Sequence, residues 1–526
     1  MPAVIGYNAS GVRNRNQRRG AFQVNAKDKR IIAQRREDLK RRLARKNVET
    51  KEREPMLGDV NLHYEMGERV RALGCGGIGA MHKMVCRLGL PEAINERLAL
   101  LKLHLPYRES DHVLNIAYNV LSGGQCLEDI EGLRQDEVYL DALGTQRIPD
   151  PTTAGDFTRR FTREAPILAL QETINQKRQV LWKRQPASFR KQGIIDIDGT
   201  IAGTQGECKE GMDLSYQGIW GYAPLIVSLA NTREPLYLVN RPGNTPSHAD
   251  AARWIDRAIA WVGGVFRKVL LRGDTAFSLT EHFDRWDEQV DFIFGYDAYP
   301  NLVRLAETLP QDAWQPLLRR PRPPLRSSPR ARPQNVKERI VKQREYKNIR
   351  LNSEQVAEFA YRPTACQRPY RMVVVRKNLS VERGERRLFD DVRYFFYITN
   401  DWDSPAAAIV WGANERCDQE NLIAQLKSGI GALRMPTGNL YSNGAYMVMA
   451  ALAWTLKAWY ALLMPRVRDR QRTLRLEFKA FARRYLHIPC QIIRTGRRLV
   501  YRIVAYNAHL ETFLLTFERI KNLPFA

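Results

Sequence analysis

The sequence predicts an α/β protein in which a helical region precedes a sheet. Between residues 193 and 296, apolar runs of strand length alternate with amphipathic helical runs, the pattern of a sheet covered by helices. Ahead of them, residues 56–190 show helical periodicity interrupted by glycine-rich turns. Strand-like runs return at 370–376 and 391–399, and a long helical region follows.

Composition narrows the class of partner. The chain has 526 residues, 44% of them hydrophobic, which is enough for several packed domains. A net charge of +26 favours a polyanion, and nucleic acid first, because Lys and Arg bind by neutralising phosphates. A membrane surface is the alternative. Seven scattered cysteines without Cys-x-x-Cys or zinc-like spacing, and an N-terminus without an apolar signal core, predict a reducing, cytoplasmic setting.

The N-terminal region is strongly basic. Residues 1–55 carry 16 Lys and Arg against 6 Asp and Glu, and residues 26–47 fit a solvated basic helix. A disordered tail is the alternative interpretation. In the following region, amphipathic runs at 64–73, 91–103 and 111–121 predict helices.

Two motifs stand out in the helical region. Gly74–Gly79 matches G-x-G-x-x-G, but the preceding residues look helical, and without a strand the motif loses the context of a dinucleotide site. Residues 148–161 predict a capped, short basic helix that ends near Arg159 and Arg160. We expect this helix to contact DNA, and a purely structural helix is the alternative.

The sheet region carries acids at strand ends. Predicted strands cover 193–200, 223–230, 236–240, 268–271 and 291–296, with helices at 249–262 and 278–289. Asp196 and Asp198 are two apart in the first strand, so both side chains lie on one face. Asp274 follows the strand at 268–271. A buried acid needs a partner, and a divalent cation is one.

The second half holds a basic stretch and a long apolar run. Residues 319–350 contain five prolines and 12 Lys and Arg against 2 Glu, which indicates a linker or an extended DNA-contacting loop. Residues 445–464 are the membrane candidate, but Lys457 lies in the middle of the run and favours a buried helix. A basic C-terminal region follows, with strand-like alternation at 490–506 and a helical end.

A helix predicted over 414–427 places Arg416, Glu420 and Lys427 on one face. They form either a surface salt-bridge ladder or a metal-binding carboxylate between two phosphate-binding side chains. With Asp198 and Asp274, Glu420 completes a set of hard oxygen ligands suited to a pair of Mg²⁺ ions. Such a pair activates water or a 3′-hydroxyl in phosphodiester chemistry.

These residues resemble a known family. The spacing Arg-x3-Glu-x6-Lys is similar to the signature of DDE transposases of bacterial insertion sequences, and so are Asp-Gly-Thr at 198–200 and Gly-Asp-x-x-Phe at 273–277. The 146 positions between Asp274 and Glu420 match the long insertion of that group. The layout over roughly 60–520 most resembles the insertion-sequence family numbered thirteen-eighty. One position departs, since Ala413 stands where the signature has Tyr.

The resemblance implies an RNase H-like catalytic core with a mostly β insertion, preceded by a helical DNA-binding region. The expected parts are a basic arm (1–55), a helical DNA-binding and dimerisation region (56–190), the core in two pieces (191–300 and 401–465), the insertion with its basic linker (301–400) and a basic C-terminal region (466–526).

The resemblance also implies roles. Asp198, Asp274 and Glu420 would be the catalytic residues that bind two Mg²⁺ ions, with Mn²⁺ as a substitute, and the Asp-x-Thr pattern favours Asp198 over Asp196. Arg416 and Lys427 would contact DNA phosphates. The chain would be a bacterial, nucleoid-associated transposase that binds terminal inverted repeats of double-stranded DNA as a homodimer, hydrolyses the element ends and joins the 3′-hydroxyl to target DNA.

Three other classes remain open at this point. A metal-dependent nuclease or resolvase would cut without joining. A DNA-binding protein without catalysis would bind and not cut. A membrane-surface protein is the third, and the helix interpretation of residues 445–464 argues against a spanning segment.

Overall fold

The computed structural model confirms an α/β protein and shows one large mixed sheet. It describes residues 23–46, 62–64, 70–104, 106–318, 350–382, 385–496 and 498–524. The nine strands of the sheet lie in the order β10-β11-β12-β13-β9-β8-β2-β6-β7. Their bounds are β2 Gln192–Gly199, β6 Leu225–Leu229, β7 Glu234–Val239, β8 Lys268–Gly273, β9 Asp291–Tyr296, β10 Gln315–Pro316, β11 Arg350–Tyr361, β12 Tyr370–Glu382 and β13 Glu385–Thr399.

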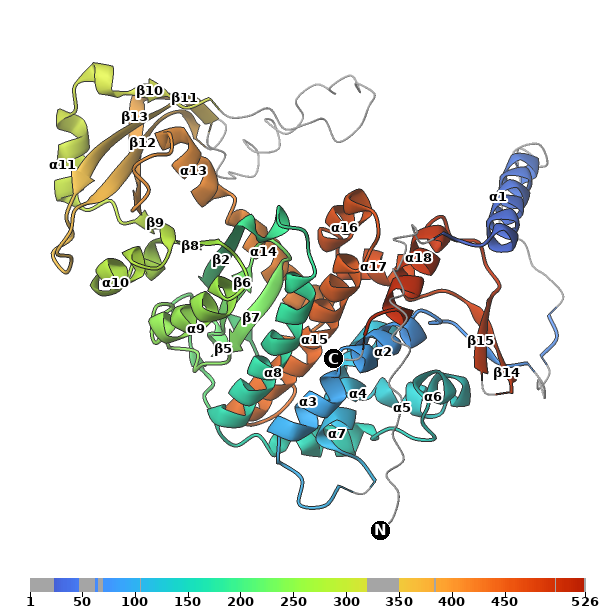
Figure 1. Cartoon of the computed structure of the whole chain (residues 1–526). Helices are drawn as coiled ribbons and strands as arrows, with labels where there is room; N and C mark the ends of the chain where they lie inside the picture. Colours follow the sequence, from blue (N-terminus) through green and yellow to red (C-terminus); the bar gives the residue numbers. More distant parts are fainter. Residues whose placement is uncertain are drawn as a thin grey trace, which may run out of the picture.

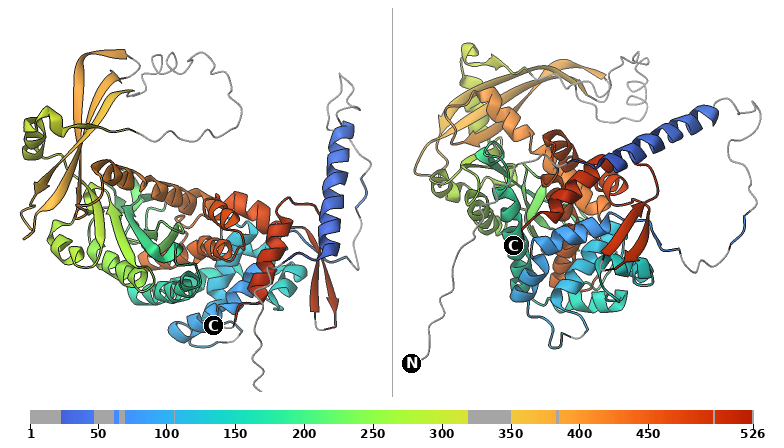
Figure 2. Two further views of the ribbon diagram at one scale, coloured as in Figure 1. Left: turned by 45° about the horizontal axis from the view of Figure 1, so that its top comes forward. Right: turned by 45° about the vertical axis from the view of Figure 1, so that its right-hand side comes forward.

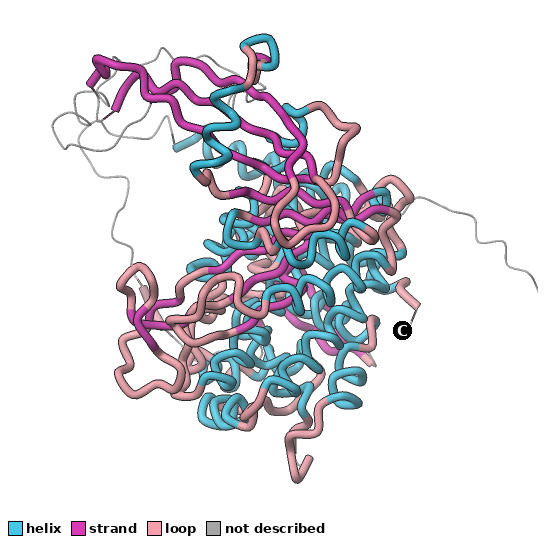
Figure 3. Tube along the Cα trace, turned by 90° about the vertical axis from the view of Figure 1, so that its left-hand side faces the viewer, coloured by secondary structure: helices cyan, strands magenta, loops and turns pink. Residues whose placement is uncertain are grey.

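The centre of the sheet is parallel and its two sides are antiparallel. β2 runs parallel to β8, and β8 runs parallel to β9. β6 is antiparallel to both β2 and β7, while β13 is antiparallel to β9. The long strands β11, β12 and β13 therefore extend the same hydrogen-bonded sheet, and they form the upper part of the molecule in Figures 1 and 3.

Helices cover both faces of the central strands. α9 (Ala251–Gly263) packs on β2, β6 and β8 through an apolar face that includes the buried Trp254 and Ile255. Gly193 lies so close to Val262 and Phe266 that a Cβ there would clash. The odd-numbered side of β2 therefore faces α9, and alternation turns Asp196 and Asp198 to the opposite face.

The helical part is built around one long helix. α15 (Leu440–Leu462) packs against α4, α8 and β7 and lies between the sheet and the N-terminal helices in Figure 1. The other helices are α2 Ile78–Arg87, α3 Leu90–Arg97, α4 Glu109–Ser122, α5 Ile130–Arg134, α6 Glu137–Leu143, α7 Pro151–Arg159, α8 Glu164–Lys183, α16 Val467–Leu474, α17 Phe478–Tyr485 and α18 Leu510–Lys521. Among the residues described above, no helix combines the length and apolarity needed to cross a membrane.

The apolar run at 445–464 thus belongs to a core helix. Lys457 is buried there, and its Nζ donates to the Leu474 carbonyl at 3.2 Å and lies 3.5 Å from the Trp454 ring centroid. Desolvation holds the pKa of Lys457 well below its usual value. This lysine is therefore accommodated by one carbonyl and one aromatic face.

The basic helix predicted near the N-terminus is confirmed as α1 (Ala26–Lys46), which projects from the body in Figure 2. Its Arg35 Nη1 donates to the Ile503 carbonyl at 2.8 Å. That carbonyl ends β15 (Arg498–Ile503), which pairs with β14 (Cys490–Thr495) as the alternation at 490–506 predicts.

The helix predicted over 64–73 is wrong for its described residues, none of which is helical, while residues 65–69 lie outside the described part of the chain. Ala72–Leu73 form β1, which pairs with β14. The two elements are more than 400 positions apart, so local periodicity carried no trace of the pairing. The helix predicted at 278–289 is divided into a 3₁₀ turn, η3 Thr280–His282, and a short helix, α10 Phe283–Asp287, and another 3₁₀ turn, η2 Thr275–Phe277, precedes it.

The insertion begins with a helix and continues as strands. α11 (Pro300–Thr308) precedes β10, and the strand β11 begins at Arg350, before any strand predicted in that region. Nearly all of the basic, proline-rich stretch predicted at 319–350 lies outside the described residues, as do residues 1–22 of the basic arm. The division of the chain into six parts stays a prediction.

Candidate active site

Two of the predicted acids lie at the carboxyl edge of the sheet. Asp198 is near the end of β2, and Asp274 follows β8 directly. Because β2 and β8 are parallel neighbours, their ends meet at one edge. Asp274 begins the 3₁₀ turn η2, where its Oδ1 accepts from the Ala276 amide at 3.0 Å. That bond fixes the carboxylate and leaves Oδ2 free to face the site.

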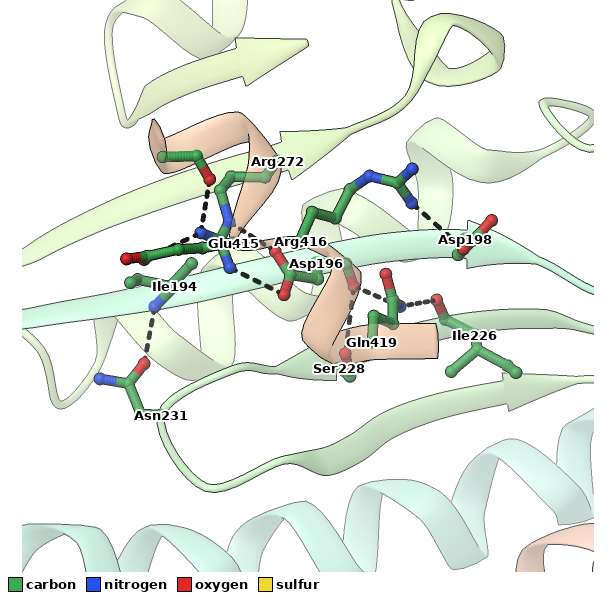
Figure 4. A network of polar contacts seen from close by, with 11 residues as sticks. Ile194, Asp196, Asp198, Ile226, Ser228, Asn231, Arg272, Glu415, Arg416 and Gln419 are labelled. Atoms are coloured by element: carbon green, nitrogen blue, oxygen red, sulfur yellow. Dashed lines mark hydrogen bonds and ion pairs between the residues drawn. The ribbon is translucent and has the colours of Figure 1, made fainter. Parts of the chain in front are cut away.

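Both carboxylates face the same guanidinium. Arg416 Nη1 donates to Asp198 Oδ2 at 3.1 Å, and Arg416 Nη2 lies 3.8 Å from Asp274 Oδ2. Figure 4 shows the Arg416 side chain reaching along the sheet to Asp198. Two negative charges therefore share one positive charge.

The electrostatics of Asp198 follow from this arrangement. Burial raises the pKa of Asp198 to about 6, Arg416 lowers it, and the negative charge of Asp274 raises it again. The carboxyl is thus short of positive charge, which is the condition under which a further cation binds favourably.

The alternative acid, Asp196, is already paired. Its Oδ1 accepts from Arg272 Nε at 2.7 Å and its Oδ2 from Arg272 Nη2 at 3.0 Å, with both side chains buried (Figure 4). Arg272 Nη1 donates in addition to the Gly412 carbonyl at 2.7 Å. Burial raises the pKa of Asp196, and Arg272 opposes that effect. Both oxygens of Asp196 are therefore used inside the protein.

The helix predicted over 414–427 is not one regular helix. α13 (Ala406–Asn414) ends before Arg416, α14 spans Cys417–Ala424, and a π-helical turn, η5, spans Gln425–Gly429. Within η5 the Ile430 amide donates to the Gln425 carbonyl at 2.9 Å, a bond over five residues. The predicted placement of Lys427 on one helical face with Arg416 and Glu420 assumed 100° per residue. That assumption fails beyond Ala424, because a π turn rotates by less per residue than an α-helix does.

Glu420 and Lys427 lie along this segment. Glu420 is exposed on α14, one turn after Arg416. Lys427 is exposed on η5 and lies near enough to Asp198 that the carboxylate opposes the desolvation that lowers the pKa of Lys427. The structure thus brings Asp198, Asp274, Arg416 and Lys427 into one electrostatic neighbourhood, with Glu420 on the helix beside them.

Sequence reasoning missed Gln419, which attaches α14 to the sheet. Its buried Nε2 donates to the Asp196 carbonyl and to the Ile226 carbonyl, both at 3.1 Å (Figure 4). These carbonyls belong to neighbouring strands, so one side chain holds the helix across β2 and β6. A signal was present, since Gln419 is the polar member of an otherwise apolar face with Leu422 and Ile423.

Comparison with known families decides the class. The model of the transposase DDE domain group 1 matches residues 67–525. The chain belongs to this family. Because the family is one of DDE transposases, membership implies a nuclease and transposition activity, and such enzymes normally use divalent metal ions.

Among solved structures, the chain is similar to a piggyBac transposase synaptic complex with hairpin DNA, at 8% identity over 86% of each chain and a TM-score of 0.31. No curated protein sequence matches the chain.

The carboxylates of this DDE family member fit a divalent cation in part. Asp198 and Asp274 converge on one cationic group from adjacent strands, and both supply hard oxygen atoms of the kind that Mg²⁺ binds. Within the described ranges, no three His, Cys, Asp or Glu side chains are grouped closely enough to hold a metal ion. A full set of ligands therefore needs at least one further oxygen donor beside this pair.

The two arginines predicted to contact DNA lie elsewhere. Arg159 and Arg160 are exposed at the end of α7, in the helical part of the molecule. The side of α7 that carries Phe157 is buried, where that ring stacks on His112 at a centroid distance of 4.4 Å. Arg159 pairs with Asp156 at 2.5 Å. The structure does not bring these arginines to the carboxylates, and their DNA contact stays a prediction.

Proposed function

We propose that the chain is a DNA transposase that binds terminal inverted repeats, cleaves the element ends by metal-dependent hydrolysis and joins the 3′-hydroxyl to target DNA. The observation that carries the proposal is the convergence of Asp198 and Asp274 on Arg416 at the carboxyl edge of two parallel strands. Family membership over residues 67–525 supports the reaction class.

We extend the proposal to the core. In the strands β7-β6-β2-β8-β9, only β6 runs against the others. An RNase H-like core is consistent with this arrangement, and the strands β10–β13 are then the mostly β insertion. The insertion-sequence family numbered thirteen-eighty is the proposed subgroup, in a bacterial, nucleoid-associated setting.

In this proposal, Asp198, Asp274 and Glu420 hold two Mg²⁺ ions, for which Mn²⁺ can substitute. When bound at these carboxylates, the ions would supply Lewis-acid chemistry, which would polarise the phosphate and activate water as a nucleophile. Arg416 exchanges its contact with Asp198 for a phosphate oxygen, and Lys427 contacts a neighbouring phosphate. Gln419 keeps α14, and with it Glu420, in place against the strands.

The chemistry then needs two displacements at phosphorus. In the first, a water oxygen bonds to phosphorus while the bond to the 3′-oxygen breaks, which leaves a 3′-hydroxyl and a 5′-phosphate. In the second, that 3′-hydroxyl oxygen bonds to a target phosphorus and displaces a target 3′-oxygen. Each step forms one P–O bond and breaks one, so no protein nucleophile is required.

The partner is double-stranded DNA, and the active form is a homodimer on the element ends. The net charge of +26 supports non-specific affinity for phosphates. The exposed basic helix α1 and the exposed pair Arg159 and Arg160 would provide contacts away from the carboxylates.

A cleavage assay tests the proposal. The full chain is incubated with a labelled duplex that carries its element's end, with Mg²⁺ or with EDTA. We expect Mg²⁺-dependent cuts at the end, lost in Asp198→Asn and Glu420→Gln while DNA binding persists. Asp418→Asn is the matched control, because Asp418 is an exposed acid on the same helix that pairs with Arg233 at 2.7 Å.

The outcomes separate the candidate functions. Cutting by Asp198→Asn and Glu420→Gln at the parent's rate would overturn the assignment of these carboxylates. Cuts without joined products in a strand-transfer assay would make the chain a nuclease or resolvase. Tight binding of the end without any cut would leave a DNA-binding protein.

A further inference from the structure

A small hairpin follows the strand that carries Asp198. β4 (Asp213–Leu214) pairs with β5 (Trp220–Tyr222), and β5 pairs in turn with β3 (Ala202–Gly203). We call residues 213–222 the edge hairpin. The turn of the edge hairpin is regular, since the Gly218 amide donates to the Ser215 carbonyl at 2.9 Å and Gly218 has a φ of 73°.

The tip of the edge hairpin exposes large apolar side chains. From 214 to 220 it contains no charged residue, in a chain in which 27% of residues are charged. The exposed fractions are 46% for Leu214, 85% for Tyr216, 43% for Ile219 and 55% for Trp220. A cluster of four such side chains on one short hairpin is more than isolated surface apolarity and indicates an interaction site.

The base of the edge hairpin is fixed. Tyr222 is buried, and its hydroxyl donates to the Glu210 carbonyl at 2.9 Å. The Glu210 amide donates to the Gly438 carbonyl at 2.8 Å, and Lys209 Nζ donates to the Met435 carbonyl at 2.5 Å. These contacts hold the hairpin to the segment between η5 and α15, so the exposed rings stand on a rigid support.

The hairpin continues the ladder that carries the candidate site. Asp198 lies opposite Ile226, the Thr200 amide donates to the Pro224 carbonyl at 2.9 Å, and Ala202 lies opposite Tyr222. At roughly 3.3 Å per residue, the six positions from Ile226 to Trp220 span about 20 Å at most. This is about six nucleotide steps along a DNA strand.

We propose that the edge hairpin binds unpaired or unstacked DNA bases next to the cleavage position, with Tyr216 and Trp220 as stacking surfaces. The inference rests on the proposed function, because it requires DNA at Asp198. An uncharged tip cannot neutralise phosphates, whereas aromatic rings stack on bases of any sequence. Apolar side chains that enter between base steps also favour DNA that is already distorted.

The test uses the full chain and two DNA probes of equal length, whose sequence is unrelated to the element's ends. One is a fully paired duplex, and the other has a short central unpaired stretch that contains 2-aminopurine. We expect the chain to bind the unpaired probe roughly tenfold more tightly and to quench its 2-aminopurine by stacking. The double variant Tyr216→Ala/Trp220→Ala should lose both the preference and the quenching while it still binds paired DNA.

Trp402→Ala is the matched control. Trp402 is 52% exposed, close to the value for Trp220, but it lies just beyond Asn400, whose side chain accepts from the Phe292 amide at the opposite edge of the sheet. We expect this variant to keep the preference and the quenching. Thermal melting and circular dichroism of both variants show that the loss is not a loss of folding.

Each outcome has one meaning. Equal binding of the two probes by the parent chain, or a preference that survives the double variant, overturns the base-stacking proposal while DNA binding stands. A double variant that changes only the oligomeric state in light scattering also overturns it, and makes the hairpin a contact between copies of the chain. Failure of the parent chain to bind either probe would instead contradict the proposed function.

Discussion

Two acids on one face of β2 show how differently the same kind of pair can be used. Asp196 and Arg272 are both buried and make two hydrogen bonds, at 2.7 and 3.0 Å. Two positions along the strand, Asp198 makes a single bond to Arg416, which also faces Asp274. The first pair is complete within the protein, and the second has more negative than positive charge.

The two pairs have different roles, since Asp196 and Arg272 support the fold, whereas Asp198 and Arg416 lie where a ligand can bind. We call Asp196 and Arg272 the closed pair. This pair joins β2 and β8, and the bond from Arg272 to the Gly412 carbonyl also holds α13, the helix that precedes Arg416. We call Asp198 and Arg416 the open pair. It lies two positions further along β2, at the carboxyl edge of the sheet, where a bound ligand can change which charges are paired. The closed pair therefore fixes the position of Asp198 and Arg416, while the charges of Asp198 and Arg416 stay available to a ligand.

The largest effect is expected from opening the closed pair. Arg272→Met leaves the Asp196 carboxylate buried without its partner and should lower the free energy of unfolding by about 3–5 kcal/mol. Urea denaturation of the purified chain measures the change. The double variant Asp196→Asn/Arg272→Met removes the unpaired charge and should recover part of the loss. A single variant as stable as the parent would show that the pair does not support the fold.

The next effect is expected from the bridge between helix and strands. Gln419→Leu removes both hydrogen bonds to the Asp196 and Ile226 carbonyls and should cost about 1–3 kcal/mol in unfolding free energy. Because Glu420 follows directly, cleavage should fall more than DNA binding does. Asn421→Leu, at an exposed position of the same helix, is the control and should change stability by less than about 0.5 kcal/mol. Equal cleavage by both variants would contradict a positioning role for Gln419.

A smaller stability effect is expected at the open pair. Arg416→Gln removes a partly exposed ion pair and should change the free energy of unfolding by less than about 1 kcal/mol. Its main effect should be on the pKa of Asp198, which rises above about 6 because Arg416 lowers it in the parent. Asp274→Asn should have the opposite effect, since Asp274 raises that pKa. Carboxyl ¹³C NMR titration measures both, and shifts of the same sign would contradict the shared-cation arrangement.

A pH dependence of stability is also expected from the Asp198 carboxyl. The pKa of Asp198 is raised in the folded state to about 6, so the folded chain binds the proton more tightly than the unfolded chain. Its contribution to stability is therefore complete below the unfolded value, about 3.9, and is lost as the pH rises through about 6. Asp198→Asn should flatten this part of the stability curve, measured without metal ions. An unchanged slope between these pH values would contradict the raised pKa.

The central sheet was predictable because its strands are apolar almost throughout. The predicted runs at 193–200, 223–230, 236–240 and 291–296 overlap β2, β6, β7 and β9, which are buried on both sides. The helix 249–262 was predictable for a related reason, since the apolar face of α9 repeats with helical spacing. Elements buried in these ways can be recognised in the sequence from the length of their apolar runs or from the spacing of their apolar residues.

The finer site was not predictable, because it depends on contacts between distant positions. Strand geometry alone does not distinguish Asp196 from Asp198, which lie on one strand face, and the partner Arg272 lies 76 positions away in sequence. The π turn at Gln425–Gly429 has residues that also fit a regular helix, and Gln425 is engaged by the Phe478 amide at 2.9 Å. The pairing of β1 with β14 was likewise not predictable, because the two strands are far apart in the sequence.

The continuous sheet has a consequence for attempts to shorten the chain. β13 occupies the free side of β9, and the outermost strand of the extended sheet, β10, is only two residues long. A chain trimmed between β9 and α13 would expose the full backbone edge of β9, a template for self-association. The long strands thus protect the core from aggregation, and a minimal version of this protein would need a replacement strand in their place.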